Sequence, residues 1–284
     1  MRLLQRQQTL NLGYRTGMVL NIAHRGARSL APENTLLAAR RAFECGADLW
    51  EADLAVSRDE ALFLFHDDCL GRTTDVGACY PDRKDEPYTA FALEELRRLD
   101  AGSWFIDHDP FEQIAAGVVG PDDLHACRQA VIPTLEEALV YTRDTGWQIN
   151  LELKKLPPPL TAFPVVERVL AMIGRVGLPM ERIILSSFNH AWLDEARTRR
   201  PDIRVQALVG YEKSGPLVWG DMHFDTYNVR STLISAEKVR ERVASGLVIN
   251  LFTVNEENRM RQFTAAGAAG LITDFPQRLA PLGL

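Results

Sequence analysis

Residues 48–66 read DLWEADLAV-SRDE-ALFLFH, and this stretch decides how the rest of the chain is interpreted. The apolar runs 48–56 and 61–66 are typical of strands, and only residues 57–60 separate them. A parallel crossover needs about a dozen residues or more, so these two strands must pair as an antiparallel hairpin. The second run is therefore an arm of the first strand and not a separate strand of a parallel sheet.

Similar strand-like runs, bounded by turn residues, recur along the chain. Including the hairpin, they lie at 18–24, 48–56, 61–66, 148–154, 182–188, 203–209, 224–230, 247–254 and 269–274. Amphipathic stretches long enough for helices lie between most of them, for example at 134–145, 162–174, 190–199, 235–245 and 256–266. Alternating strands and helices predict an α/β fold with a parallel sheet. Without the hairpin arm eight strands remain, which is the count of a closed (β/α)8 barrel, or TIM barrel.

The length of 284 residues fits one such barrel. We expect a single domain over residues 18–284 and an inserted segment at about 70–130, after the hairpin, because that segment is rich in charged and turn residues. The one convincing helix in this segment is LEELRRL, at residues 93–99. Elsewhere, the stretch 209–224 is short for a strand-to-helix connection. We expect residues 1–17 to be either a disordered tail or an extension that results from translation starting at an upstream codon.

Composition excludes several classes of partner. Lysine plus arginine number 32 against 38 acidic residues, a net charge of −6, which argues against nucleic acid and against stable membrane association. Four cysteines without a C-x-x-C pair predict free thiols. The leading residues lack the apolar core of a secretory signal, so we expect a cytoplasmic protein, with the oligomeric state left open.

Ionisable residues collect where the predicted strands end, and active sites of TIM barrels lie at that rim. The residues concerned are His24-Arg25-Gly26, Glu51, Asp53, His66-Asp67, Glu152, Lys154, Thr253, Asn255 and Thr273-Asp274.

Three of these acids predict a metal site. Glu51 and Asp53 are two residues apart in a strand and share a face, as do Glu152 and Lys154. Single acids on strands commonly make surface salt bridges, but three carboxylates inside apolar runs repel one another unless a cation joins them. Oxygen ligands suit Mg²⁺ or Ca²⁺, so the sequence predicts one such ion.

His24 and His66 are candidates for proton transfer. Either histidine alone would more often be structural, but two of them at one rim with three carboxylates supply a proton donor and an acceptor. Arg25 offers a guanidinium fork for phosphate oxygens. Gly26 lets the backbone approach a ligand, or else forms a plain turn.

Residues 32–35, Pro-Glu-Asn-Thr, precede the amphipathic stretch LLAARRAFE. Asn34 or Thr35 is a good helix N-cap, so a structural role is favoured for this segment. The other four histidines show no comparable pattern and are left unassigned; they are His108, His125, His190 and His223.

Residues 23–76 resemble the glycerophosphodiester phosphodiesterase family. They combine HRG, PENT, GAD followed by E-x-D, and HDD-x-L-x-RTT in the order and spacing of that family. Weaker matches are LDAGSWF, LELK, LSSF, FTVN and GLITDFP, so that the resemblance spans residues 19–280. Two positions depart from it, because Glu60 stands where glycine is common and Phe252 where many members carry tryptophan.

The resemblance implies a barrel with an inserted segment and a catalytic centre. A divalent cation would be held at the positions of Glu51, Asp53 and Glu152. General acid and base would be His24 and His66. Lys154, like Arg25, matches a position that contacts the phosphate.

Three functions are compatible with these residues. The preferred one is metal-dependent hydrolysis of a glycerophosphodiester to glycerol 3-phosphate and an alcohol, with water or the glycerol 2-hydroxyl as nucleophile. The alternative is a lysophospholipase D with the same site, for which the insertion supplies aromatic residues but no basic amphipathic helix. A non-catalytic phosphate-binding barrel is less favoured, because no carboxylate or histidine of the set is missing.

Recognition of the glycerol is expected at the rim of the fourth and seventh barrel strands. The candidates there offer hydroxyl, amide and apolar surfaces, and they are Ser187, Phe188, Phe252 and Asn255. Ser187 could instead cap the following helix, and Phe252 could belong to the core. The polar insertion favours small water-soluble diesters over lysophospholipids.

Overall fold

The computed structural model describes residues 18–284, so the expected tail over 1–17 lies outside the described residues. A strand occupies each of the nine predicted runs. They are β1 (Leu20–Ala23), β2 (Leu49–Val56), β3 (Leu62–Leu64), β4 (Ile149–Glu152), β5 (Ile183–Ser187), β6 (Arg204–Val209), β7 (Thr226–Arg230), β8 (Val248–Phe252) and β9 (Gly270–Thr273).

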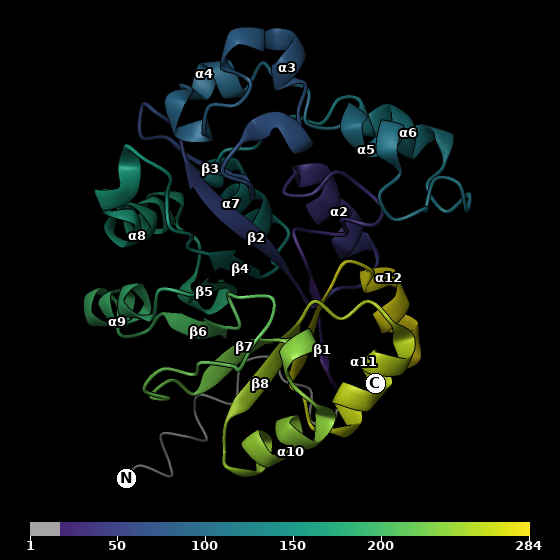
Figure 1. Cartoon of the computed structure of the whole chain (residues 1–284), viewed down its shortest axis with the longest axis vertical. Coiled ribbons are helices and arrows are strands. Elements are labelled where there is room, and N and C mark those ends of the chain that lie inside the picture. Colours follow the sequence, from purple (N-terminus) through teal and green to yellow (C-terminus); the bar gives the residue numbers. More distant parts are fainter. Residues whose placement is uncertain (1–17) are drawn as a thin grey trace.

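Eight of these strands close into a parallel barrel in the order β1-β2-β4-β5-β6-β7-β8-β9 (Figure 1). The barrel closes between β1 and β2, where Ile22 pairs with Leu49. The strand β3 pairs antiparallel with the outer part of β2, with Leu54 opposite Leu64. Both the TIM barrel and the hairpin arm are therefore confirmed.

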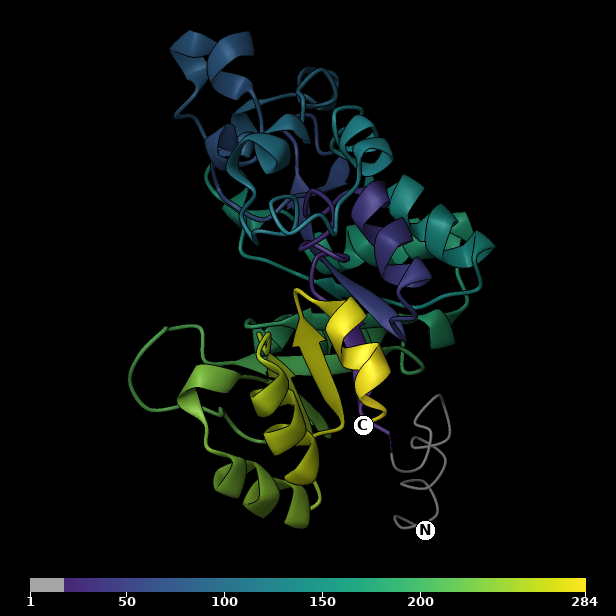
Figure 2. The ribbon, with the colours of Figure 1, turned by 90° about the vertical axis from the view of Figure 1, so that its right-hand side faces the viewer.

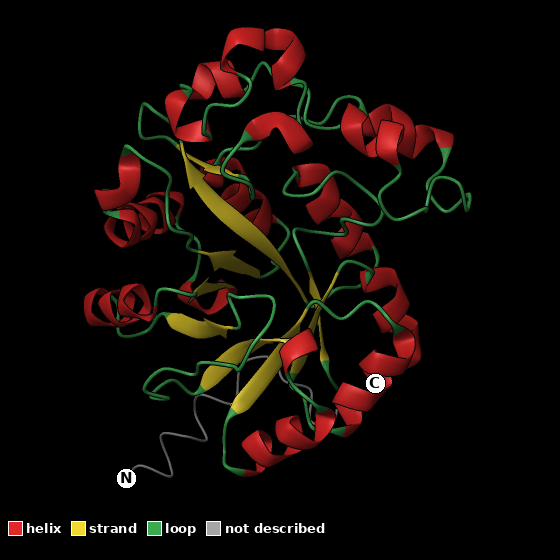
Figure 3. Ribbon diagram, in the orientation of Figure 1, coloured by secondary structure: helices red, strands yellow, loops and turns green. Residues whose placement is uncertain are grey.

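Helices surround the barrel and cover the outer face of its strands (Figure 3). The main ones are α2 (Leu36–Glu44), α7 (Leu135–Asp144), α8 (Val165–Val176), α9 (His190–Arg199), α10 (Ala236–Ala244) and α11 (Glu257–Ala265), followed by the short α12 (Pro276–Leu279). Thr134 caps α7 by accepting from the Glu137 amide, as expected of T-x-x-E. Between β6 and β7, residues 210–225 form a loop in place of a helix, and Gly210, Gly215, Pro216 and Gly220 disfavour a helix there.

The insertion holds more helix than its single predicted segment. Its helices are α3 (Val76–Cys79), α4 (Leu93–Leu96), α5 (Ser103–His108) and α6 (Pro121–Cys127), joined by 3₁₀ turns. Helices of four to seven residues are too short to produce a recognisable hydrophobic period. Figures 1 and 2 show α3 to α6 at one end of the molecule, with α3 and α4 near the outer part of β2 and α5 and α6 beyond α2.

Two layers of side chains fill the barrel and leave its mouth to charged groups. Ile22, Leu49, Ile184 and Ile272 pack into one buried cluster. The other layer is polar, with Asn250 donating to Asn228 at 2.9 Å. Side chains alternate along each strand, so the next inward positions fall at the carboxyl ends. This alternation brings the predicted acids and cations to one rim.

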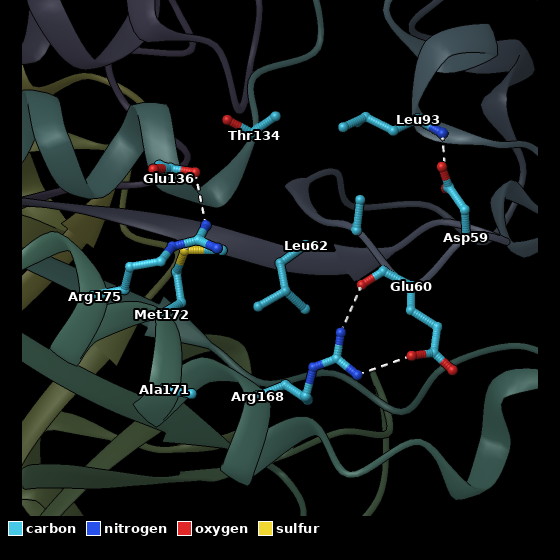
Figure 4. Close-up of a pocket in the computed structure, with 11 residues that line it drawn as sticks. Asp59, Glu60, Leu62, Leu93, Thr134, Glu136, Arg168, Ala171, Met172 and Arg175 are labelled. Carbon is cyan, nitrogen blue, oxygen red and sulfur yellow. Dashed lines mark hydrogen bonds and ion pairs between the residues drawn. The ribbon is translucent and has the colours of Figure 1, made fainter.

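The tip of the hairpin is fixed against α8. Glu60 adopts a left-handed conformation with φ of 61°, which explains why glycine suits this position. Arg168 of α8 donates to the Glu60 carboxylate at 2.8 Å (Figure 4). A cavity of about 390 Å³ beside this contact is lined by Asp59, Glu60, Ala61, Leu62, Leu93, Thr134, Glu136, Arg168, Ala171, Met172 and Arg175. None of the predicted site residues lines it.

The cysteines Cys45, Cys69, Cys79 and Cys127 are free thiols, as predicted. Among the helices of residues 18–284, none combines the length and the apolar character needed to span a bilayer.

Gly26 joins β1 to the loop before α2 and has φ of +80°. A Cβ atom there would lie 2.5 Å from the Ala38 carbonyl carbon, so close packing on α2 requires glycine. Gly46 has a similar φ of +75° but open space around it.

We predict that Gly46→Ala lowers the free energy of unfolding by about 1–2 kcal/mol, the cost of the left-handed backbone. Gly26→Ala should lose about 1–3 kcal/mol more, because the collision with Ala38 adds overpacking. Urea denaturation of the two variants measures the difference. Equal losses would show that the contact with α2 is not the constraint.

Candidate active site

The three predicted acids form one cluster at the mouth of the barrel. Ligand oxygens of Glu51, Asp53 and Glu152 lie within 4.8 Å of one another. Asp53 on β2 pairs in register with Glu152 on β4, and Glu51 lies two residues earlier on the same face. Glu51 and Asp53 are only 4% and 1% exposed.

Repulsion within the cluster shows in the ionisation of its members. Burial, together with the charges of Asp53 and Glu152, raises the pKa of Glu51 well above its usual range. Burial and Asp53 raise the pKa of Glu152 to about 7. Burial also acts to raise the pKa of Asp53, but Lys154 and Arg25 outweigh it and hold that pKa below its usual value. Clustered carboxylate oxygens that still repel one another fit a hard divalent cation.

Arg25 and Lys154 flank this cluster. The Arg25 amide donates to Glu51 Oε2 at 2.9 Å, and its Nε lies 3.1 Å from Asp53 Oδ2. Lys154 Nζ lies 3.6 Å from Asp53 Oδ1 and donates to the His66 carbonyl at 2.7 Å. Both cations therefore lie where an anion bound beside the cluster would meet them.

His24 is oriented by a carboxylate at the end of β9. Its Nδ1 lies 2.6 Å from Asp274 Oδ1, and an ionised carboxylate can only accept, so the proton is on Nδ1 and Nε2 is left for a ligand. Burial and Arg25 lower the pKa of His24, while Asp274 opposes them.

His66 has an equivalent arrangement at the end of the hairpin arm. Its Nδ1 lies 2.5 Å from Asp67 Oδ1, and Asp67 Oδ2 accepts from Arg72 Nε at 2.5 Å. Both histidines thus have Nδ1 bound to a carboxylate. The two imidazoles and the acidic cluster occur at the same end of the barrel.

Aromatic rings occupy the part of the rim formed by the ends of β5, β6 and β8. Phe188 lies 5.2 Å from Tyr211 and 6.1 Å from Phe252, measured between ring centroids. The Arg230 guanidinium lies 5.1 Å from the Phe252 centroid and donates through Nε to the Gly210 carbonyl. These rings and Arg230 form an amphipathic wall beside the cluster.

Two predicted glycerol contacts have other partners. Ser187 is fully buried, donates to the Leu153 carbonyl at 2.7 Å and accepts from the Asn189 amide. Asn189 is itself the N-cap of α9, so Ser187 does not cap that helix. Ser187 follows the inward-facing position 186, so its side chain points out of the barrel. Asn255 donates to Asp274 Oδ2 at 2.7 Å and accepts from the Asp274 amide, so it holds the partner of His24.

The sequence analysis missed several residues at this end of the barrel. Thr35 caps α2 as expected, whereas Asn34 donates to Asp53 Oδ2 at 2.9 Å and accepts from the Asp53 amide. Glu33 contacts Arg25 and two further arginines. Only Arg230 carried a usable signal, because it ends β7 in phase with the inward-facing Asn228.

The fold and the site define a class: a TIM barrel whose carboxyl-end rim holds a three-carboxylate centre flanked by two carboxylate-bound histidines. The model of the glycerophosphoryl diester phosphodiesterase family matches residues 24–278. The chain therefore belongs to this family, and the resemblance found in its motifs is confirmed.

Relatives and solved structures support this family assignment. A glycerophosphodiester phosphodiesterase of Caldanaerobacter subterraneus is 30% identical over 93% of this chain and 97% of its own length. The glycerophosphoinositol inositolphosphodiesterase of Mus musculus is 29% identical over 91% of this chain. That alignment covers 46% of the mouse protein, so the chain spans about half the length of this relative.

Among solved structures, an Oleispira antarctica phosphodiesterase in complex with the product sn-glycerol-3-phosphate superimposes with a TM-score of 0.73. It is 28% identical, and the match covers 92% of this chain and 94% of the other. The arrangement of strands and helices is therefore that of a phosphodiesterase barrel.

Asn255→Ala removes an amide that fixes Asp274 and, through it, His24. We predict that kcat on a glycerophosphodiester falls by about 10-fold while KM changes little, since loss of such an orienting partner typically costs that much. Steady-state kinetics on the folded variant measure both constants. A raised KM with unchanged kcat would instead show that Asn255 binds substrate directly.

Proposed function

We propose that this protein hydrolyses glycerophosphodiesters to glycerol 3-phosphate and an alcohol. The observation that carries the proposal is the pairing of a three-carboxylate cluster with two histidines whose Nδ1 atoms are each bound to a carboxylate. Family membership agrees with this chemistry. Residues 18–284 act as one domain, and the location in the cytoplasm stays a prediction.

Glu51, Asp53 and Glu152 would hold one divalent cation, Mg²⁺ or Ca²⁺, at the barrel mouth. Such an ion supplies charge stabilisation to the phosphoryl oxygens as they become more negative. Arg25 and Lys154 add positive charge beside the same oxygens, and both are already fixed by contacts with Asp53. The phosphate is therefore bound by groups that need no rearrangement.

His24 and His66 carry the protons. One imidazole Nε2 accepts the proton of the nucleophile, which is water or the glycerol 2-hydroxyl, and the other donates to the departing alcohol. Asp274 and Asp67 bind the Nδ1 atoms of the two rings and so keep each ring in one orientation.

The organic part of the substrate lies against the aromatic side of the rim. Phe188 and Phe252 cover it, Arg230 adds donors, and Asn255 acts through Asp274. Small water-soluble diesters suit this polar rim. A lysophospholipase D activity is the second candidate, favoured by Tyr211, which is 72% exposed.

Metal dependence is tested by Glu51→Gln. In the wild type we predict that Mg²⁺ at 100 times its Kd raises the free energy of unfolding by about 2.7 kcal/mol, because binding offsets carboxylate repulsion. Glu51→Gln should lose both this increase and the metal-dependent activity while remaining folded.

Glu60→Gln is the matched control, since Glu60 is an exposed carboxylate outside the cluster and should leave metal binding unchanged. Full turnover of the wild type in excess chelator would contradict metal dependence.

The substrate class is tested with released glycerol 3-phosphate as the readout. We predict a higher kcat/KM for glycerophosphocholine, glycerophosphoethanolamine or glycerophosphoglycerol than for lysophosphatidylcholine below its micelle concentration, because the rim offers polar contacts through Arg25, Lys154 and Arg230. A preference of about tenfold for the lysolipid, equal to about 1.4 kcal/mol of transition-state binding, would favour the second candidate. Binding of all these diesters without turnover would favour a phosphate-binding barrel.

A further inference from the structure

Glu33 is the most heavily paired carboxylate near the catalytic rim. Its side chain is 3% exposed and contacts three arginines. Oε1 accepts from Arg25 Nη1 at 2.7 Å and from Arg72 Nη2 at 2.6 Å. Oε2 accepts from Arg28 Nη2 at 2.7 Å and from Arg72 Nη1 at 3.0 Å. Helix capping at the start of α2 uses Thr35, so it does not account for Glu33.

Two of these arginines lead to the two histidines. Arg28 Nη1 lies 3.5 Å from Asp274 Oδ1, the oxygen that also contacts His24 Nδ1. Arg72 Nε donates at 2.5 Å to Asp67, which holds His66 Nδ1. A continuous series of carboxylates and guanidinium groups therefore runs from one imidazole to the other, with Glu33 at its centre.

Aromatic side chains of the insertion pack against two arginines of this series. The Arg28 guanidinium lies 5.2 Å from the Phe111 ring, and the Arg72 guanidinium lies 5.8 Å from the Trp104 ring. All three nitrogens of the Arg72 guanidinium are bound to Glu33 or Asp67, so this guanidinium has no free pair of N–H groups to bind a phosphate. Planar guanidinium groups bound at two or more points have little freedom to turn. The series is thus rigid as well as continuous.

An ion network that is buried at Glu33 and Asp274 and partly exposed at Arg72 could serve stability alone, as many such networks do. This one differs in where it ends, because both ends are the carboxylates that orient the catalytic imidazoles. His24 follows a barrel strand and His66 follows the hairpin arm, so the two rings come from different elements. Their relative position has to be set by contacts between those elements.

We propose that Glu33 is a positioning residue that sets the placement of His24 and His66 relative to each other through Arg28 and Arg72. The proposal rests on the proposed function for the roles of the two histidines. Glu33 itself touches no reacting atom in this proposal.

The test uses the full chain with ¹⁵N-labelled histidine, in which six histidines give few imidazole resonances. In Arg72→Lys the His66 resonances should move and those of His24 should stay, because a lysine cannot contact Glu33 and Asp67 together. Arg28→Lys should move the His24 resonances only. Glu33→Gln should move both sets.

Kinetics supply the second readout. Glu33→Gln should lower kcat by about 10- to 100-fold with KM nearly unchanged, since misplacement of catalytic groups slows the reaction more than it weakens binding. Glu137→Gln is the matched control, because Glu137 binds Arg97 through both oxygens away from the rim and should change neither kcat nor the imidazole resonances.

The lysine variants decide the proposal even where Glu33→Gln fails to fold. Unchanged imidazole resonances in Arg72→Lys and Arg28→Lys, or a raised KM with normal kcat in Glu33→Gln, would overturn it. A wild type inactive on every glycerophosphodiester would refute the proposed function instead, while the resonances would still report on the placement of the histidines.

Discussion

Repulsion among the carboxylates of Glu51, Asp53 and Glu152, held within 4.8 Å at the barrel mouth, is the constraint on which this end of the molecule depends. Buried like charges are tolerated only where opposite charge or donors surround them. Arg25 and Asn34, both with left-handed backbone conformations, contact Asp53 from the loop after β1. The irregular geometry of that loop is thus explained by the acids that it has to balance.

Alternation along strands made much of the site predictable. Residues two apart on a strand share a face, so the sequence alone placed the three acids and Lys154 at one rim, and the structure brings them together. The same rule separates Ser187, the last residue of β5, from Phe188, because consecutive side chains of an extended chain point to opposite sides. A prediction that used both residues for one ligand took no account of this.

Contacts made by loops could not be predicted in the same way. Residues 32–35 carry a strong helix-start pattern, and Thr35 caps the helix as this pattern predicts. The pattern does not predict the contacts of Glu33 and Asn34. Their partners lie on β2 and in the insertion, and no period relates them. The insertion itself is ordered by short helices and by arginine–aromatic contacts such as Arg83 over Phe91 at 4.1 Å, which leave no periodic signal.

The four-residue separation that identified the hairpin also determines where the second histidine lies. Since β2 continues to Val56, past Asp53, the returning strand β3 brings the chain back toward the barrel mouth. The Phe65 amide then donates to the Asp53 carbonyl at 3.0 Å, and the next residue, His66, accepts from Lys154 through its carbonyl. A parallel crossover would have carried this segment around the outside of the barrel to begin a strand at the opposite end. The antiparallel return is therefore what places His66 beside the acidic cluster, and a shift of the hairpin by one residue would turn its side chains to the other face.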